Sequence, residues 1–175
     1  LHLEMAGNTT LQDLDSYLRA IWLECCGHLS AFHIGPYRYT QLFNDGWRIG
    51  DEKSLNVPVR KVFAPGMEIP YEYDFGTTSH LLIKVLDERE GRPTTRYPIA
   101  LMARNEMEPV PCAECGAPAT YLCIECMYER DGEDCTLCDE HAEIHPCDDY
   151  GEPMPLVNSP RTGMCGYEGP AEPPY

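Results

Sequence analysis

The stretch that decides the fold of the C-terminal third is residues 112–147, CAECGAPATYLCIECMYERDGEDCTLCDEHAEIHPC. It contains nine side chains that can bind a metal ion, which are Cys112, Cys115, Cys123, Cys126, Cys135, Cys138, His141, His145 and Cys147. Pairs of soft ligands two residues apart are typical of structural zinc, because a CxxC turn can place two thiolates on one tetrahedral ion. The spacing therefore predicts a zinc-binding region that metal holds together.

The ten cysteines of the chain would also fit the disulfide framework of a small secreted domain. However, the N-terminal residues lack the basic, apolar and small-residue order of a signal peptide, and no apolar run approaches the roughly 18 residues of a membrane helix. His141 and His145 lie within the cysteine cluster, where zinc uses them as ligands and a disulfide scheme does not. We therefore predict zinc and a reducing, cytoplasmic location.

Four successive ligand pairs normally bind two ions in a cross-brace, in which the first and third pairs share one ion and the second and fourth share the other. In its spacing the segment resembles compact B-box and MYND-type zinc fingers. Three pairs follow from the spacing: Cys112 with Cys115, Cys123 with Cys126, and His145 with Cys147. The third pair in the order of the chain is either Cys135 with Cys138 or Cys138 with His141, so one of the nine candidates is left over.

The alternative to two ions is a zinc ribbon, which would bind a single ion with the first two pairs only. In either arrangement, protein side chains fill all four positions around each ion. A closed shell leaves no position for water, so we predict structural zinc, with two ions in the cross-brace, and no catalytic role for the metal.

The charge of the chain is strongly acidic, at −16, and it is unevenly distributed. Residues 111–175 contain fourteen acidic side chains and only two basic ones, Arg130 and Arg161. Zinc modules that bind nucleic acid need Lys and Arg side chains to displace the counterions around phosphates. This composition therefore disfavours binding to DNA, RNA and anionic membranes. It favours a protein partner, or serves solubility alone.

The first 110 residues predict a compact α+β unit. Residues 1–6 can form a strand, and Thr9 with Gln12 has the spacing of a capping box that starts a helix. One apolar stripe then follows at steps of three and four residues, through Leu11, Leu14, Leu18, Ile21, Trp22 and Cys25. We expect Gly27 to end this helix.

The strands of this unit are predicted after the helix. Residues 28–34 form a plausible strand, and residues 35–58 give no clear assignment. Residues 67–75 alternate with a period of two, so that Met67, Ile69, Tyr71, Tyr73 and Phe75 share one face. Residues 79–88 and 96–103 are the next strands. Consecutive strands joined by short turns are most often antiparallel neighbours, so we expect a small antiparallel sheet with the helix over its apolar face.

Several stretches resemble a known family. Residues 17–32 (YLRAIWLECCGHLSAF), 65–67 (PGM) and 71–76 (YEYDFG) are similar to the plasmid open-reading-frame-three-like domain family, some members of which are labelled transposon-passenger TnpR-like. Residues 157–161 (VNSPR) and 165–167 (CGY) resemble the tail of a subgroup that carries a C-terminal zinc-binding region. The resemblance implies an α+β fold and no established activity. Subgroup members have cysteine where His141 stands here, which favours Cys138 with His141 as the third pair and leaves Cys135 as the alternative ligand.

Candidate catalytic residues also occur. His28, Asp74 and His80 could form a general acid/base site, but no nucleophile motif or phosphate-binding loop accompanies them. Cys25 and Cys26 could be a redox pair, although their spacing is not CxxC, and we expect Cys25 to pack in the core and Cys26 to lie at the helix end. The sequence therefore predicts no catalytic residue and favours a protein that is not an enzyme.

The sequence as a whole predicts three regions: an α+β domain over residues 1–108, a zinc-binding module over 109–150 and an irregular Pro/Gly-rich tail over 151–175. Together they indicate a non-enzymatic, zinc-binding protein-interaction module. The alternative is a nucleic-acid transaction factor associated with mobile elements, whose binding would weaken steeply with added salt.

Overall fold

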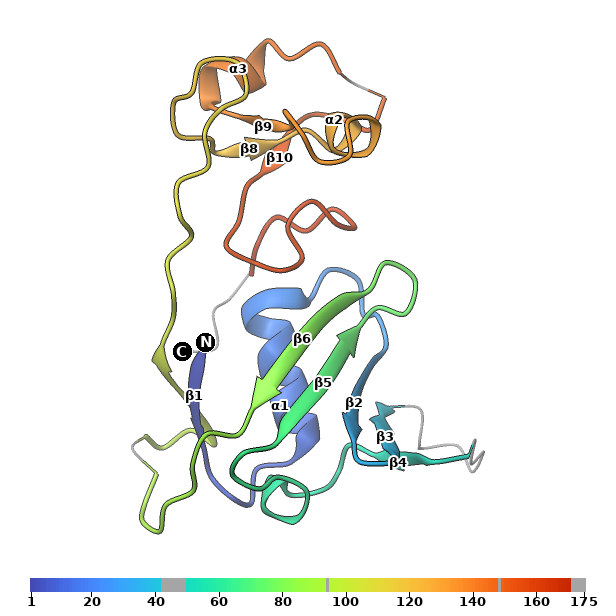
Figure 1. Cartoon of the computed structure of the whole chain (residues 1–175), viewed down its shortest axis with the longest axis vertical. Helices are drawn as coiled ribbons and strands as arrows, with labels where there is room; N and C mark the ends of the chain where they lie inside the picture. The colour runs from blue at the N-terminus through green and yellow to red at the C-terminus, as the bar shows by residue number, and fades with distance from the viewer. Residues whose placement is uncertain (42–49, 94, 148, 171–175) are drawn as a thin grey trace. The chain divides into compact units, whose positions relative to one another are not determined.

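The computed structural model of the chain describes residues 1–41, 50–93, 95–147 and 149–170. Contacts divide the chain into an N-terminal unit, residues 1–105, and a C-terminal unit, residues 106–170, which are described separately below. The fold is α+β with mainly antiparallel sheets, as predicted (Figure 1).

The main helix of the N-terminal unit, α1 (Leu11–Leu18), begins at a capping box. The box uses Thr10 and Asp13, with the Thr10 N–H donating to Asp13 Oδ2 at 2.8 Å and the Asp13 N–H donating to Thr10 Oγ1 at 3.1 Å. The predicted box of Thr9 and Gln12 was therefore wrong by one residue. The physical reason is that the buried Thr9 hydroxyl instead donates to the Pro98 carbonyl at 3.0 Å.

The end of the helix also differs from the prediction. After α1 the chain continues through one π-helical turn, Arg19–Leu23, and Glu24 is already extended. Helical structure thus stops before Gly27, which adopts a positive φ of 74° and turns the chain toward the sheet. The predicted stripe does face the core: its first four members, Leu11, Leu14, Leu18 and Ile21, are at most 4% exposed.

The larger sheet has five strands in the order β4-β3-β2-β5-β6. Its strands are β2 (Ser30–Ile34), β3 (Tyr37–Thr40), β4 (Glu52–Ser54), β5 (Glu68–Tyr73) and β6 (Ser79–Lys84). Neighbours are antiparallel except for β3 and β4, which are parallel. Residues 35–58 had no clear assignment from the sequence. In the structure, β3 and β4 lie in this stretch, and a short 3-10 helix, Val59–Lys61, follows it. Residues 42–49 of the stretch lie outside the described residues.

The alternation predicted for β5 holds from Ile69 to Tyr73 and then fails. Ile69, Tyr71 and Tyr73 are fully buried, whereas Phe75 is 40% exposed. The reason is Asp74, whose φ of +65° breaks the extended backbone and reverses the side on which the next side chain lies.

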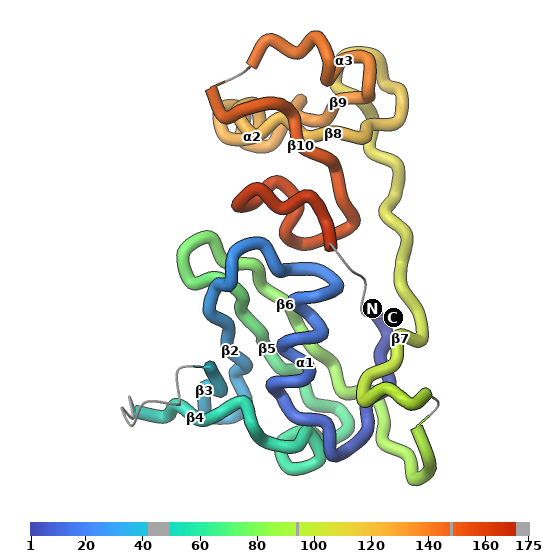
Figure 2. The backbone as a smooth tube through the Cα atoms, turned by 180° about the vertical axis from the view of Figure 1, so that it is seen from behind, coloured from blue at the N-terminus to red at the C-terminus, as the bar shows by residue number. Residues whose placement is uncertain are grey.

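A second, two-stranded sheet pairs β1 (His2–Met5) with β7 (Ile99–Ala103). We expected β7 to lie beside β6, so this prediction was wrong. Residues 85–98 are long enough to carry the chain away from β6, and β7 pairs with the N-terminal strand instead. Figures 1 and 2 show α1 lying across the five-stranded sheet, with β1 along its side. The core of this unit lies between these elements.

One polar network is buried in this core. The Asp15 carboxylate is fully buried and accepts hydrogen bonds from Arg19 Nε at 2.7 Å, Tyr71 Oη at 2.7 Å and Gln41 Nε2 at 2.9 Å, as well as from the Ser30 hydroxyl. Burial and the neighbouring Asp15 raise the pKa of Tyr71, so the phenol stays protonated and donates. The network connects α1 to the sheet, and its polar groups satisfy one another.

The C-terminal unit has little regular structure. It consists of a three-stranded sheet in the order β10-β8-β9 and two short helices. The elements are β8 (Tyr121–Leu122), α2 (Ile124–Glu129), β9 (Thr136–Leu137), α3 (Asp139–Glu143) and β10 (Met154–Pro155). Among the described residues of this unit, Leu122 and Leu137 are the buried aliphatic side chains of the core, beside three buried cysteines, and a few partly buried side chains pack against them. Strands of two residues and so small a core indicate that something else holds this unit together.

Candidate metal centre

Two groups of four metal-competent side chains lie in the C-terminal unit. The first group comprises Cys112, Cys115, Cys138 and His141, and the second comprises Cys123, Cys126, His145 and Cys147. Within each group, the ligand atoms all lie within 4.8 Å of one another. The eight residues are those that the sequence analysis favoured as ligands.

The first group is built by a turn and by the start of a helix. Cys112 and Cys115 belong to a tight turn, in which the Gly116 N–H donates to the Cys112 carbonyl at 2.9 Å and Gly116 has a φ of +74°. Cys138 caps the N-terminus of α3, and His141 lies one turn further along this helix. A three-residue step on a helix places both side chains on the same face, toward the turn.

The second group repeats this design. Cys123 caps the N-terminus of α2, where its sulfur accepts from the Cys126 N–H at 3.4 Å, and Cys126 lies in the first turn of that helix. His145 and Cys147 follow the end of α3. Both groups therefore combine one pair at the start of a helix with one pair from a turn or loop.

The distances within the groups can be compared with those around a zinc ion. Zinc binds sulfur at about 2.3 Å and nitrogen at about 2.0–2.1 Å, so tetrahedral angles place two sulfurs about 3.8 Å apart and a sulfur and a nitrogen about 3.5 Å apart. In the first group, the Cys115 and Cys138 sulfurs lie 3.9 Å apart, and His141 Nδ1 lies 3.5 Å from Cys112 Sγ and 3.3 Å from Cys138 Sγ.

In the second group, Cys126 Sγ lies 3.6 Å from Cys147 Sγ and 3.3 Å from His145 Nε2. Each of these separations is within about 0.3 Å of the tetrahedral value given above. The side chains that are present thus fit zinc in identity, number and spacing, and both groups are compatible with metal binding.

The pKa shifts of the thiols differ within the two groups. Although burial raises it, backbone N–H groups of Cys138, Cys115 and Glu114 lower the pKa of Cys112 to about 6. Burial and the adjacent Cys126 thiol raise the pKa of Cys147 to about 12. Neighbouring thiolates repel one another, and a divalent cation between them would favour the ionised form of each.

The two groups are interleaved along the chain. The pair Cys123 and Cys126 of the second group lies between the two pairs of the first group. An ion in each group would therefore connect segments that the other ion does not, so that the two ions together would close the whole unit into one crossed framework.

Cys135 is the one candidate that lies in neither group. It is 6% exposed, and its sulfur donates to the Gly132 carbonyl at 3.2 Å. Burial raises the pKa of this thiol, which fits a buried neutral side chain. The structure thus places Cys138 and His141 together and leaves Cys135 in the small core.

The residues raised as possible acid/base groups do not form one site. His28 Nδ1 lies 3.5 Å from Asp74 Oδ1, whereas His80 Nδ1 lies 3.9 Å from Glu72 and is 70% exposed. Cys25 packs against the core and Cys26 is exposed after the helix end, as expected from the sequence.

A further set of metal-competent residues was missed by our reading of the sequence. Cys25, Cys26 and His28 lie together, and the signal that could have revealed them is the local pattern Cys-Cys-Gly-His, which places three soft donors within four residues. Each of the ten cysteines, all of which are among the described residues, carries a thiol that is not part of a disulfide.

The helices of the described residues are too short or too polar to span a lipid bilayer. Among protein families, the model described as "Plasmid pRiA4b ORF-3-like protein" matches residues 2–147. No curated protein and no solved structure matches the chain significantly. Because the matched span covers the N-terminal unit and all eight side chains of the two groups, the chain belongs to the plasmid pRiA4b ORF-3-like family.

Proposed function

We propose that the C-terminal unit binds two structural zinc ions in a cross-brace and serves as a protein-interaction module. The first ion is held by Cys112, Cys115, Cys138 and His141, and the second by Cys123, Cys126, His145 and Cys147. The observation that carries the proposal is the presence of two interleaved sets of four donors, within each of which the ligand atoms lie within 4.8 Å of one another.

The structural role of the metal follows from the number of donors. Four protein ligands complete the shell of a tetrahedral zinc ion, so no position remains at which the ion could activate water or polarise a substrate. What zinc supplies in this unit is folding free energy, because the described residues give it a small core, in which Leu122 and Leu137 are the buried aliphatic side chains.

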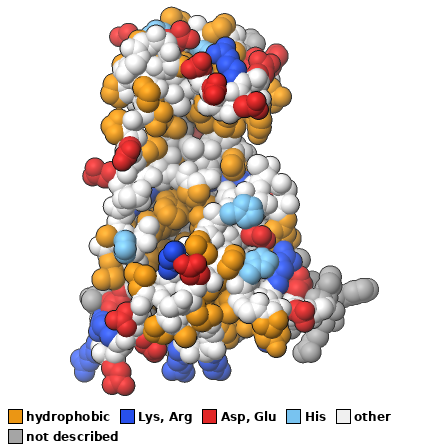
Figure 3. All heavy atoms as spheres, viewed as in Figure 1, with side chains coloured by type: hydrophobic (Ala, Val, Ile, Leu, Met, Phe, Trp, Pro, Cys, Tyr) orange, Lys and Arg blue, Asp and Glu red, His pale blue; other side chains and the backbone are white. Residues whose placement is uncertain are grey.

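The interaction role is supported by the surface of the same unit. Tyr128 and Tyr150 are 57% and 62% exposed, and their ring centroids lie 5.9 Å apart. Exposed acidic side chains accompany them, among them Glu129 and Asp149. Figure 3 shows hydrophobic and acidic side chains interspersed on the viewed face of this unit. Exposed tyrosines are typical anchors of protein interfaces, and the acidic surroundings repel nucleic acid.

The metal part of the proposal is tested by native mass spectrometry of the full chain. Replacing one pair of each group in turn, as Cys112→Ser/Cys115→Ser and Cys123→Ser/Cys126→Ser, should each reduce the number of bound zinc ions relative to the unaltered chain. Cys135→Ser is the matched control and should keep the full number. Equal ion counts in the unaltered chain and in both pair variants would refute the cross-brace.

The interaction part is tested by capture of proteins from the native host. Tyr128→Ser and Tyr150→Ser, at exposed positions, should release a partner that the unaltered chain retains, while the zinc count stays the same. Binding to duplex DNA that weakens steeply as salt is raised would instead favour the alternative, a nucleic-acid transaction factor of mobile elements.

A further inference from the structure

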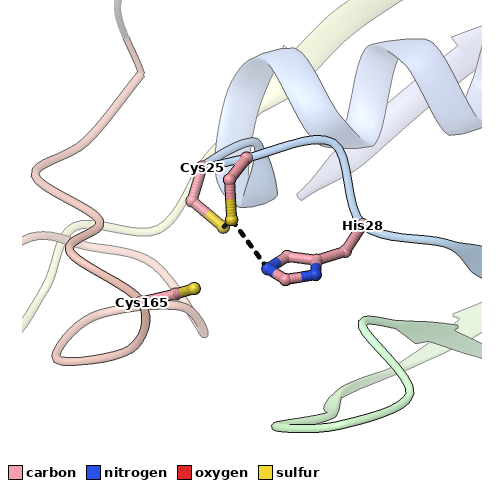
Figure 4. Close-up of side chains that lie close together, drawn as sticks. Cys25, His28 and Cys165 are labelled. Atoms are coloured by element: carbon pink, nitrogen blue, oxygen red, sulfur yellow. Dashed lines mark hydrogen bonds between the residues drawn. The ribbon is translucent and has the colours of Figure 1, made fainter.

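The loop that joins the main helix to the five-stranded sheet gathers three soft donors. Helical structure ends at Leu23. Gly27, with its positive φ of 74°, then folds the chain back so that His28 approaches Cys26. The sulfurs of Cys25 and Cys26 lie 3.6 Å apart, and His28 Nε2 lies 2.8 Å from Cys26 Sγ. Figure 4 shows the His28 ring turned toward the cysteine sulfurs, with the short contact dashed.

The His28 ring is held in this orientation by its other nitrogen. His28 Nδ1 faces the Asp74 carboxylate at 3.5 Å, and the ring packs edge-on against Tyr73, with centroids 5.7 Å apart and an interplanar angle of 84°. A carboxylate on the far nitrogen is the arrangement that usually orients a metal-binding histidine, since it directs the lone pair of the other nitrogen toward the ion.

Asp74 is itself fixed in place. It is 6% exposed, its N–H donates to the Leu29 carbonyl at 2.8 Å, and its Oδ1 accepts from the Gly76 N–H at 2.9 Å. It also has a φ of +65°, a conformation that costs free energy for a residue with a side chain. The strained backbone at the end of β5 thus holds a carboxylate behind the histidine.

We propose that Cys25, Cys26 and His28 bind a zinc ion in the N-terminal unit, with Asp74 as the positioning residue for His28. Two sulfurs and one imidazole are a ligand set that zinc prefers over harder divalent ions. The sulfur separation of 3.6 Å already fits one tetrahedral ion. The contact between Cys26 and His28 would lengthen by about 0.7 Å when an ion entered between them.

This site differs in kind from the two groups of the C-terminal unit. Three donors from one short loop fill three positions of a tetrahedral shell and leave the fourth to a donor outside the loop. Such a shell exchanges its metal and its fourth ligand more readily than a shell of four donors drawn from interleaved segments. We expect this ion to be the first that a chelator removes.

The test compares ion counts in the zinc-loaded, desalted full chain by native mass spectrometry. Cys25→Ser/Cys26→Ser and, separately, His28→Gln should each bind one ion fewer than the unaltered chain. His80→Gln, a histidine of the same unit that faces Glu72, is the matched control and should keep the full number. A thermal melt checks that each variant is folded. Because the experiment measures a difference, failure of the cross-brace would not change the expected loss of one ion.

The role of Asp74 has its own readout. Asparagine tolerates a positive φ, so Asp74→Asn removes the negative charge while keeping the backbone conformation. The zinc affinity of the loop, measured by competition with a chromophoric chelator, should fall by about 10- to 100-fold with no loss of ions from the C-terminal unit. An equal ion count in the unaltered chain and in the folded loop variants would overturn the site, and an unchanged affinity in Asp74→Asn would overturn the positioning role.

Discussion

Removing metal from the chain should unfold the C-terminal unit and leave the N-terminal unit folded. The buried aliphatic side chains of the C-terminal unit are Leu122 and Leu137, at 5% and 1% exposure. Burying a leucine contributes about 1.5–3 kcal/mol, so the pair provides roughly 3–6 kcal/mol. A structural zinc ion contributes about 10–16 kcal/mol to folding in small zinc-dependent domains, which is comparable to the whole stability of about 5–15 kcal/mol of a typical domain and larger than the contribution of the two leucines.

The N-terminal unit responds differently, because it has a core of its own. Fifteen buried hydrophobic side chains pack between α1 and the strands of this unit. This core does not depend on a metal ion. Removing zinc from the loop that contains Cys25 should therefore loosen that loop without unfolding the sheet.

Hydrogen exchange measured by mass spectrometry resolves the two responses. With excess chelator, peptides that cover β8, α2 and α3 should exchange at the rate of an unstructured chain, while peptides from β5 and β6 should stay protected. Restoring zinc should restore protection across the whole C-terminal unit in one step, because the two ions stabilise the same small fold. Persistent protection of β8 and α2 in the metal-free chain would refute the reasoning.

Three further predictions concern single side chains. Asp15→Ala should destabilise the N-terminal unit by about 3–5 kcal/mol in urea unfolding, because it leaves the buried Tyr71 hydroxyl without its acceptor and removes one of the two carboxylates that pair with Arg19; a loss below 1 kcal/mol would show that the network matters little. Cys135→Ala should leave the ion count unchanged and lower the melting temperature of the zinc-loaded chain slightly, since it deletes one buried sulfur outside both groups; loss of an ion would make Cys135 a ligand. Gly163→Ala should destabilise the zinc-loaded C-terminal unit for two reasons. The positive φ of Gly163 costs about 1–2 kcal/mol for a residue with a side chain, and the new methyl would in addition lie 2.5 Å from Leu122 Cδ2. Gly166→Ala is its control, because Gly166 has a similar φ of +69° but open space around its Cα, so an equal loss in both variants would argue against the clash.

Features that depend on neighbours in the sequence were predicted well. The apolar stripe of α1 and the alternation of β5 up to Tyr73 follow from the periods of a helix and a strand, and both are present. The errors lie where a distant residue intervenes. Thr9 is drawn to Pro98, 89 positions away, so the cap moves to Thr10. Likewise, β7 pairs with the first strand of the chain, a choice that its own residues do not encode.

The candidate metal groups show the same division. The sequence by itself determined which side chains could act as ligand pairs, because a two-residue gap constrains two side chains through the local backbone alone. The order of the pairs also predicted the cross-brace, in which the first pair faces the third and the second faces the fourth. Only the tertiary structure brings the donors of each group within 4.8 Å, pairs β7 with β1, and sets Asp74 behind His28. The physical reason is that pairing between distant segments depends on packing over the whole unit, and that packing is a property of the folded chain.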